Sequence, residues 1–299
     1  MNLTKTHLAT IIGTALLLCA SACAADAPVN PQQPWLDTRL TPDQRAALAL
    51  KAMTQDEKFQ LIRTEFGDTN NGHPMPAGAL GSAGYQPAPS RLGLPALQES
   101  DAGLGVAKPL SAGATALPSG LASAASFDPA LAYAGGAMIA REAHHRGFNI
   151  MLAGGADLVR DPRNGRNFEY AGEDPLLTGL IVGNAIAGIQ SEHLVSTVKH
   201  YALNDLETAR NTLSADISRS AARESDLLAF EIAIDTGHPG SVMCSYNRLN
   251  SVYTCEDDWL LNTVLKHDWH YPGFVMSDWG AVHSAAKAAL AGLDQESAG

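Results

Sequence analysis

Residues 273–280, Gly-Phe-Val-Met-Ser-Asp-Trp-Gly, hold the pattern that decides the fold, an apolar run that leads directly into a carboxylate. A short apolar run next to glycine is typical of a buried strand. Four earlier runs repeat the pattern, because each also leads into polar or ionisable side chains. These runs are 96–98 before Asp101, 148–152 before Asp161 and Arg166, 195–198 before Lys199 and His200, and 241–243 before Tyr246.

Longer stretches with helical spacing alternate with these runs, at 129–145, 176–190, 219–235, 259–267 and 281–290. Strand and helix in alternation predict parallel strands joined by crossover helices. The two architectures with that connectivity are an open doubly wound sheet and a closed eight-stranded barrel. An open sheet gathers its chemistry at one switch point, whereas a barrel draws it from the carboxyl ends of several strands. Five polar strand ends therefore predict a (β/α)8 TIM-type barrel.

Two helices are predicted ahead of the barrel, at 45–53 and from Thr54 onward. Thr54 and Glu57 form the sequence signature of a capping box, in which each side chain binds a free backbone N–H at the helix start. The following stretch, 67–95, is rich in glycine and proline. We predict that it is mostly loop.

The N-terminus is predicted to be a secretory signal peptide, residues 1–25, followed by a polar tether at 26–44. Lys5 precedes an apolar run at 8–19 and small residues at 21–25, which is the order found in such leaders. A buried N-terminal helix is the alternative. The apolar run is too short to cross a bilayer. We therefore expect an exported protein, periplasmic or secreted, without a stable membrane span.

The amino-acid composition argues against nucleic-acid binding. The 299 residues are 45% hydrophobic and carry a formal net charge of −11, so a large core is available and a basic surface for nucleic acid is not.

Beyond the leader only two cysteines remain, Cys244 and Cys255, with ten residues between them. They form either a disulfide, worth about 3 kcal/mol for such a loop, or two buried thiols. No group of Cys, His and carboxylates has the spacing of a metal site, and His144 and His145 are expected on the surface.

Two charged motifs could carry chemistry. The segment 160–169 combines arginines, a glycine and Glu169, which suits a rigid loop that presents guanidinium groups, although a solvated ion-pair loop is the alternative. At the end of a strand, Lys199 and His200 can both turn into a cleft. Downstream, a helical spacing of three places three side chains on one face, where they could support that pair. These side chains are Asn204, Glu207 and Arg210.

Asp278 is the candidate nucleophile, because a carboxylate at a strand end can attack an electrophilic carbon. Trp279 would form a wall against a flat ring, and a hydrogen bond from Tyr246 would keep the carboxylate ionised. The alternative for Asp278 is a helix N-cap, since a helical pattern follows. The glycines at 179, 183 and 188 follow no strand, so a phosphate-binding loop is not expected.

Four long motifs occur in the order found in a known family. They are RDPRNGRNFEYAGEDP at 160–175, KHYALNDLETAR at 199–210, VMCSYNRLN at 242–250 and GFVMSDWGAVH at 273–283. With these motifs, residues 45–299 resemble the N-terminal barrel domain of family 3 glycoside hydrolases, the β-glucosidase group.

The resemblance implies retaining hydrolysis of terminal, non-reducing β-D-glucosyl residues of glucosides or oligosaccharides, without metal or organic cofactor. It makes Asp278 the nucleophile that forms a covalent glycosyl-enzyme, with Tyr246 and Trp279 beside it. It implies sugar-hydroxyl ligands and supporting residues, and it favours the disulfide between Cys244 and Cys255. The hydroxyl ligands are Asp101, Arg166, Lys199 and His200, and the supporting residues are Glu169, Glu207 and Arg210.

The same resemblance sets an expectation for the C-terminus. In this family the general acid usually comes from a sandwich domain that follows the barrel, and this sequence stops at Gly299. We therefore expect a barrel that is incomplete at its C-terminus and lacks the acid. The leading hypothesis is an exported β-glucosidase, and the alternatives are a β-xylosidase of the same family or a catalytically impaired sugar-binding fragment.

Overall fold

The computed structural model describes residues 30–69, 72–108 and 113–298, and the chain divides into two compact units, residues 1–49 and 50–299. The described part of the first unit holds a 3-10 turn at Pro34–Leu36 and most of helix α1 (Pro42–Ala52). The predicted signal peptide and the first residues of the predicted tether lie outside the described residues. Within those residues, no helix has the length and apolar character that a membrane crossing requires.

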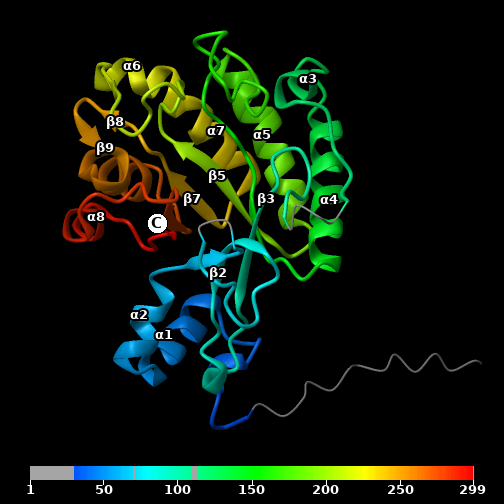
Figure 1. The fold of residues 1–299 in the computed structure, drawn as a ribbon, viewed down its shortest axis with the longest axis vertical. Coiled ribbons are helices and arrows are strands. Elements are labelled where there is room, and N and C mark those ends of the chain that lie inside the picture. Colours follow the sequence, from blue (N-terminus) through cyan, green and yellow to red (C-terminus); the bar gives the residue numbers. More distant parts are fainter. Residues whose placement is uncertain (1–29, 70–71, 109–112, 299) are drawn as a thin grey trace, which may run out of the picture. The chain divides into compact units, whose positions relative to one another are not determined.

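The second unit is built on a curved sheet in which all five predicted strands lie side by side (Figure 1). The sheet order is β1-β2-β3-β4-β5-β7-β10, and the strands from β3 onward are parallel. Only β2 runs antiparallel to both of its neighbours. The strands are β1 (Glu65–Gly67), β2 (Ser82–Gln86), β3 (Leu97–Asp101), β4 (Ile150–Leu152), β5 (Val195–Tyr201), β7 (Ser241–Cys244) and β10 (Phe274–Ser277).

An eighth segment brings the two edges of this sheet together. Gln295 forms a parallel bridge with Met276 of β10, and Glu296 forms one with Arg63, just ahead of β1. The backbone N–H groups of Ser277 and Thr64 donate to the carbonyls of Gln295 and Glu296, both at 3.0 Å. The eighth segment forms only these isolated bridges, and no helix follows it in the described residues, which end at 298. This is the predicted (β/α)8-type barrel, incomplete at its C-terminus.

Alternation along the strands separates the interior of the barrel from its helix-covered outside. One cluster of buried side chains fills the interior, and its members fall at every second position of their strands. They are Ala83, Ile150, Leu152, Met243 and Met276, with Leu97, Val195, Phe274 and Trp279 packed against them. Side chains of the opposite parity, such as Met151, Val198 and Val242, pack in clusters with helical residues instead.

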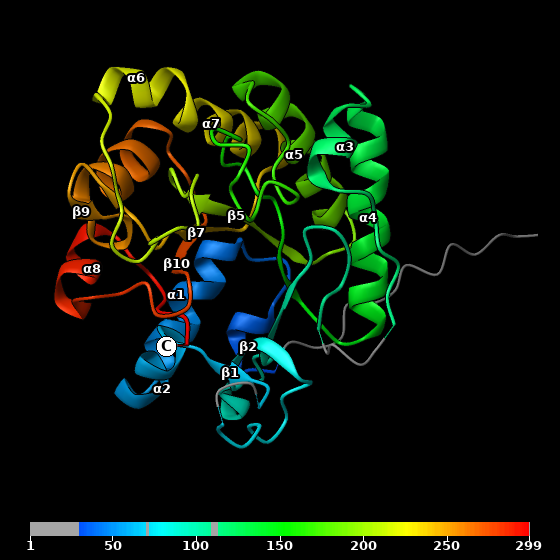
Figure 2. The same ribbon diagram turned by 45° about the horizontal axis from the view of Figure 1, so that its top comes forward.

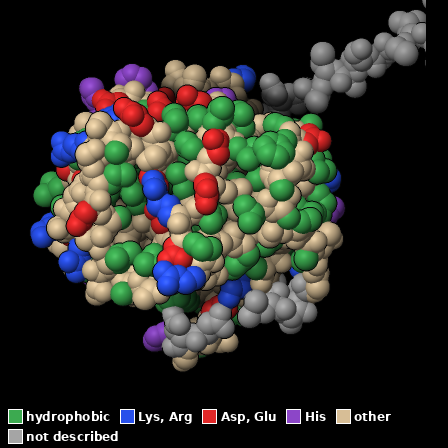
Figure 3. Space-filling view, turned by 90° about the horizontal axis from the view of Figure 1, so that it is seen from above, with side chains coloured by type: hydrophobic (Ala, Val, Ile, Leu, Met, Phe, Trp, Pro, Cys, Tyr) green, Lys and Arg blue, Asp and Glu red, His purple; other side chains and the backbone are tan. Residues whose placement is uncertain are grey.

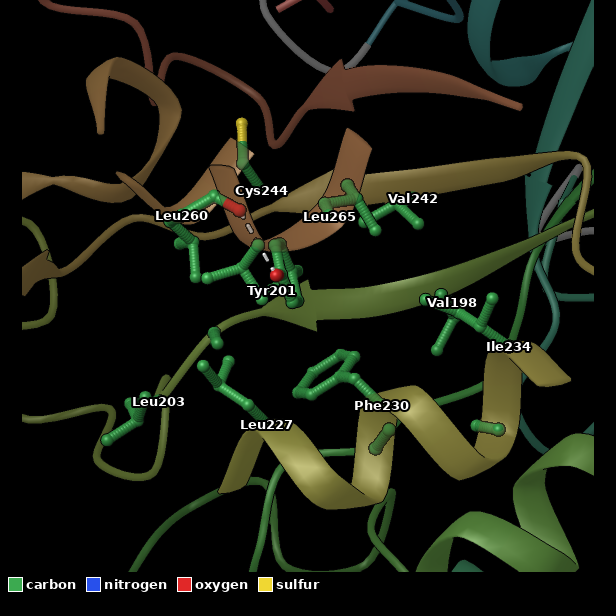
Figure 4. Close-up of a cluster of buried hydrophobic side chains, with 14 of the residues drawn as sticks. Val198, Tyr201, Leu203, Leu227, Phe230, Ile234, Val242, Cys244, Leu260 and Leu265 are labelled. Atoms are coloured by element: carbon green, nitrogen blue, oxygen red, sulfur yellow. Dashed lines mark hydrogen bonds between the residues drawn. The ribbon is translucent and has the colours of Figure 1, made fainter. Parts of the chain in front are cut away.

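The largest outer cluster lies between β5, β7 and helix α7 (Asp226–Gly237), as Figure 4 shows. Tyr201 of β5 meets Phe230 of α7 edge to face, with ring centroids 5.2 Å apart. The Tyr201 hydroxyl donates to the carbonyl of Leu260 at 3.2 Å, so its polar end is satisfied inside the core. Burying each such aromatic or aliphatic side chain contributes roughly 1.5–3 kcal/mol to the packing of helix on sheet.

Helices between the parallel strands follow the predicted pattern, and α4, α5 and α7 cover the outer face of the strands (Figures 1 and 2). Helix α2 begins after Thr54 with the predicted capping box, and helix α4 has the predicted bounds. Small connecting helices and a three-stranded sheet complete the unit. The remaining elements are α2 (Gln55–Leu61), η2 (Ser90–Leu92), α3 (Gly120–Ala124), α4 (Pro129–His145), α5 (Pro175–Gln190), β6 (Ser214–Ala215), α6 (Arg219–Glu224), β8 (Arg248–Leu249), β9 (Val252–Tyr253), η3 (Thr254–Glu256), the π-helix η4 (Trp259–Asp268) and α8 (Ala285–Ala291).

One predicted helix is interrupted. The helix predicted at 219–235 breaks at Ser225 into α6 and α7, because the Ser225 hydroxyl bonds the carbonyl of Ala221 and the carboxylate of Asp226. The stretch 67–95 is mostly loop, as predicted, but it also contains the buried strand β2, which was not predicted. Its glycine reflects a close approach rather than a turn, since a Cβ on Gly84 would lie 2.0 Å from Oε2 of Glu99 on β3.

The glycines of α5 serve helix packing. A Cβ on Gly188 would lie 2.1 Å from the carbonyl oxygen of Tyr133 in α4, which holds the two helices at backbone contact. Gly188→Ala is therefore expected to lower the free energy of unfolding by about 2–3 kcal/mol, because the helices must move apart. Gly113→Ala is the control, since a Cβ there meets nothing within 4 Å. Equal denaturant midpoints for the two variants would contradict this account of the crossing.

Candidate active site

A cavity of about 310 Å³ opens at the carboxyl ends of the parallel strands. The sequence-predicted nucleophile and all six predicted substrate-binding residues line it. They are Asp278, Asp101, Arg166, Lys199, His200, Tyr246 and Trp279, and the lining is completed by Ala83, Arg210 and Met243. Residues from five strands or the loops after them thus converge on one small space, as expected for a barrel.

Strand parity explains why three of these side chains point inward. Asp101, Lys199 and Asp278 each lie an even number of positions beyond an interior-cluster residue of the same strand, at or just after the end of that strand. His200 has the opposite parity and nevertheless lines the cavity. At this point the register between β5 and β7 shifts, and both members of the pair line the cavity.

Asp278 is 7% exposed at the base of the cavity. Its Oδ1 accepts the N–H of Trp279 at 2.8 Å, and its Oδ2 lies 3.7 Å from Nε2 of His200. Burial raises the pKa of this carboxyl, while the Trp279 N–H, Lys199 and a hydrogen bond from the Tyr246 hydroxyl oppose that effect. The N-cap alternative is not what the structure has, because α8 begins only at Ala285 and its N-cap is Ser284.

Glu169 holds two of the cations that line the cavity in place. Its Oε1 lies 3.1 Å from Nζ of Lys199, and its Oε2 accepts hydrogen bonds from Nε and Nη2 of Arg166 at 2.9 and 2.8 Å. Burial by itself favours the neutral acid, but the two cations hold the pKa of Glu169 below its ordinary value. Nζ of Lys199 also lies 3.4 Å from Oδ1 of Asp101. The cavity thus contains charged hydrogen-bond donors and acceptors that ion pairs hold in place, and such groups can bind hydroxyls.

Arg210 lies in the cavity wall itself, although the sequence indicated only a supporting position. Its guanidinium sits 4.0 Å from the centroid of the Tyr246 ring and bonds Oε2 of Glu207 at 2.8 Å. Asn204 donates to the other oxygen of Glu207 at 3.2 Å. The three side chains are linked through Glu207, as predicted, but the backbone at 204–212 is a series of turns and not a helix.

The arginines of segment 160–169 differ in role, because one is presented to the cavity and another belongs to a solvated ion pair. Arg166 enters the cavity, whereas Arg163 pairs with Asp161 in a salt bridge whose arginine side chain is 87% exposed. Arg160 does neither, because it turns to the buried carboxylate of Asp226. Of these three arginines, only Arg166 therefore lines the candidate site.

Trp279 rests on strand β2, which the sequence analysis did not identify. Its indole Nε1 donates to the carbonyl of Ala83 at 3.3 Å, and a Cβ on Gly84 would lie 3.1 Å from Cζ2 of the indole. Small residues at 83 and 84 therefore form a shelf for the aromatic ring. The run Ser82-Ala83-Gly84 was the available signal, but small residues resemble loop sequence in the absence of their partner strand.

The described residues contain no group of three or more His, Cys, Asp or Glu that could hold a metal ion. The face shown in Figure 3 carries Lys and Arg side chains separated by acidic and apolar ones.

Comparison with known proteins assigns this arrangement to a family. Residues 77–297 match the family model described as the glycosyl hydrolase family 3 N terminal domain. The chain belongs to glycosyl hydrolase family 3. The predicted family 3 resemblance is thereby confirmed over most of the barrel.

Family 3 relatives are considerably longer than this chain. The β-glucosidase BoGH3A of Bacteroides ovatus is 34% identical over 307 residues, which cover 99% of this chain and 39% of that protein. Thermostable β-glucosidase B of Acetivibrio thermocellus is 38% identical, covering 69% of this chain and 29% of that one. The structure of β-glucosidase 3B from Thermotoga neapolitana in complex with glucose superposes with a TM-score of 0.78 at 34% identity, over 84% of this chain and 36% of that one. The chain thus spans well under half the length of these relatives.

In this family 3 barrel, Cys244 and Cys255 form a disulfide with Cα atoms 5.2 Å apart. The loop they close carries Tyr246 and the β8–β9 hairpin. Cys244→Ser with Cys255→Ser is expected to lower the free energy of unfolding by about 3 kcal/mol, since the unfolded chain loses its cross-link. Thermal unfolding with and without reductant measures this. The double variant should be insensitive to reductant, and a wild type that is equally insensitive would contradict the prediction.

Proposed function

We propose that this domain binds the terminal glucosyl unit of a β-glucoside and that Asp278 attacks its anomeric carbon. One observation carries the proposal, a nearly buried carboxylate that lines the cavity, where Lys199, Arg166 and Tyr246 favour its ionised form. Attack forms a bond between the carboxylate oxygen and C1 while the bond from C1 to the aglycone oxygen breaks. Water then cleaves the glycosyl ester, and the sugar leaves with its configuration retained.

The cavity lining supports a monosaccharide as the bound unit. Its volume of about 310 Å³ is at the lower end of small-molecule sites. Asp101, Lys199 and Arg166 offer charged hydrogen-bonding groups to hydroxyls, and Trp279 offers a flat apolar surface. The relatives described above are named β-glucosidases, and one of their structures is a glucose complex.

Protonation of the leaving group is assigned to no residue of this cavity. Retaining hydrolysis needs two carboxyl groups about 5–5.5 Å apart, one to attack and one to protonate. Besides Asp278, the only carboxylate in the cavity lining is Asp101, and it is paired with Lys199. An informative test therefore uses a substrate whose aglycone departs without a proton.

The test is intact mass after incubation with dinitrophenyl 2-deoxy-2-fluoro-β-glucoside. The fluorine slows both chemical steps and the dinitrophenolate leaves unaided, so the glycosyl ester should accumulate. We expect one adduct per chain, located on the peptide that contains Asp278, and slower labelling in the presence of glucose. A protein with native circular dichroism that takes up no label would remove Asp278 as nucleophile and favour a sugar-binding function.

We also propose that the protein is exported. The sequence pattern at 1–25 and the disulfide between Cys244 and Cys255 support this, since disulfides persist in oxidising compartments. Fractionation of cells that produce the full chain, with N-terminal sequencing of the product, tests it. A cytoplasmic product that retains Met1 would overturn the proposal.

A further inference from the structure

Asp157 is a fully buried carboxylate behind the cavity, and the proposed reaction does not use it. Its Oδ2 accepts the backbone N–H of His200 and its Oδ1 accepts that of Asn204, both at 3.0 Å. Each oxygen therefore has its own backbone donor. Asp157 ties the turn after Lys199 to the chain that leaves β4.

The imidazole of His200 has different neighbours at its two nitrogens. Nε2 lies 2.7 Å from Nη2 of Arg166. Nδ1 lies 3.2 Å from the hydroxyl of Tyr170 and 3.4 Å from Oδ2 of Asp157. Burial lowers the pKa of His200 well below its ordinary value, and Arg166, Lys199 and Arg210 lower it further. The ring is therefore neutral and carries one N–H.

The position of that proton follows from the chemistry of arginine. A guanidinium group has five N–H donors and no acceptor, so the Nε2 atom that faces Arg166 must offer a lone pair. The proton is then on Nδ1. That nitrogen lies 3.2 Å from the hydroxyl oxygen of Tyr170 and 3.4 Å from Oδ2 of Asp157. Burial raises the pKa of Asp157 to about 7, while the N–H groups of His200 and Asn204 and the charge of Arg166 oppose that effect, and Asp157 is an acceptor in its ionised form.

We propose that Asp157 is a positioning residue that holds His200 in the Nδ1–H tautomer and thereby keeps His200 from donating a hydrogen bond to Asp278. The inference rests on the proposed function only where it treats Asp278 as the nucleophile. Nε2 of His200 is 3.7 Å from Oδ2 of Asp278. In the opposite tautomer, an Nε2–H would face both that oxygen and the N–H donors of Arg166. A new donor at the attacking oxygen would stabilise the ground-state carboxylate and weaken it as a nucleophile.

The first measurement needs no substrate and no change at Asp157. In wild-type protein labelled with ¹⁵N at histidine, long-range proton–nitrogen correlations distinguish the two tautomers. The His200 signals are identified by their loss in His200→Gln. We expect a protonated Nδ1 and an unprotonated Nε2, and the reverse pattern would overturn the inference.

Two variants separate the possible acceptors. Tyr170→Phe removes the competing hydroxyl and should leave His200 as Nδ1–H. Asp157→Asn replaces one oxygen by an N–H donor and should populate the Nε2–H form, with labelling of Asp278 by the fluoroglucoside slowed about 10-fold or more. Asp161→Asn, at an exposed carboxylate, is the labelling control. A tautomer that changes in Tyr170→Phe but not in Asp157→Asn would assign the role to Tyr170.

The outcomes also separate this inference from the proposed function. An Nδ1–H tautomer that depends on Asp157, in a protein that is never labelled, would leave the positioning role and remove the nucleophile. Labelling of Asp278 in a protein whose His200 carries its proton on Nε2 would support Asp278 as the nucleophile and remove the positioning role of Asp157. If Asp157→Asn does not fold, the wild-type spectrum and Tyr170→Phe still decide, because loss of the Nδ1–H form in Tyr170→Phe would exclude Asp157 as the sufficient acceptor.

Discussion

Asp278→Asn is expected to abolish formation of the glycosyl adduct and to slow the release of dinitrophenolate from an activated β-glucoside by a factor on the order of 10⁴ or more. The amide nitrogen and oxygen of asparagine are poor nucleophiles toward an anomeric carbon, so the first chemical step is lost. The fold should persist, because an asparagine carbonyl can still accept the N–H of Trp279 that Oδ1 of Asp278 accepts. Stopped-flow absorbance and intact mass measure the two effects.

A matched variant separates chemistry from charge. Asp161→Asn also removes one carboxylate, but that carboxylate pairs with Arg163 on the surface. It should be labelled at the wild-type rate. Undiminished labelling of Asp278→Asn would show that another group attacks the sugar.

Glu99→Gln is expected to flatten the pH dependence of stability. Glu99 lies inside the barrel on β3, fully buried, and in the described part of the chain neither of its oxygens has a hydrogen-bond partner. Burial, with a smaller contribution from Asp101, raises its pKa to about 8. The unfolded chain releases this proton near pH 4.5, whereas the folded chain keeps it until about pH 8. Folding thus takes up a proton between these values, and the free energy of unfolding falls as pH rises.

One titrating group changes the free energy of unfolding by up to about 1.4 kcal/mol per pH unit, so Glu99 should lower that of the wild type by about 3 kcal/mol between pH 5 and pH 8. The variant Glu99→Gln should not show this loss. Urea unfolding at both pH values measures the difference. Glu142→Gln is the control, because hydrogen bonds from Thr115 lower the pKa of that exposed carboxyl and its contribution is complete above pH 5. An unchanged difference between pH 5 and pH 8 in Glu99→Gln would mean that Glu99 is already ionised at pH 5.

Much of the fold could be predicted from local sequence patterns. The five parallel strands, the helices between them and the Thr54 capping box were predictable because apolar runs, helical spacing and cap residues act over a few neighbouring positions. Strand β2 was not, since its small residues become part of a strand only through the pairing of β2 with β1 and β3 and the contact of Ala83 with Trp279. The break at Ser225 was also missed, because Asp226 is drawn to Arg160, 66 positions earlier.

Candidate site residues were identifiable because each follows the carboxyl end of a predicted strand and because four motifs resemble one family. Their mutual arrangement was not. The sequence could place Arg210 near its supporting partners, but its position over the Tyr246 ring depends on how the turns at 204–212 fold. Asp157 and Glu99 carried no recognisable signal, since a carboxylate that becomes buried resembles an exposed one in sequence.

By itself, the sequence determined which residues end strands, and therefore the barrel and the set of polar side chains available to its cavity. The tertiary structure decided which of these line the cavity, which support them and which nitrogen of His200 carries the proton. The physical reason is that those properties depend on distances between residues far apart in the chain. Lys199 and Asp101 are 98 positions apart, and the pairing of β3 and β5 on either side of β4 in one curved sheet brings Nζ within 3.4 Å of Oδ1.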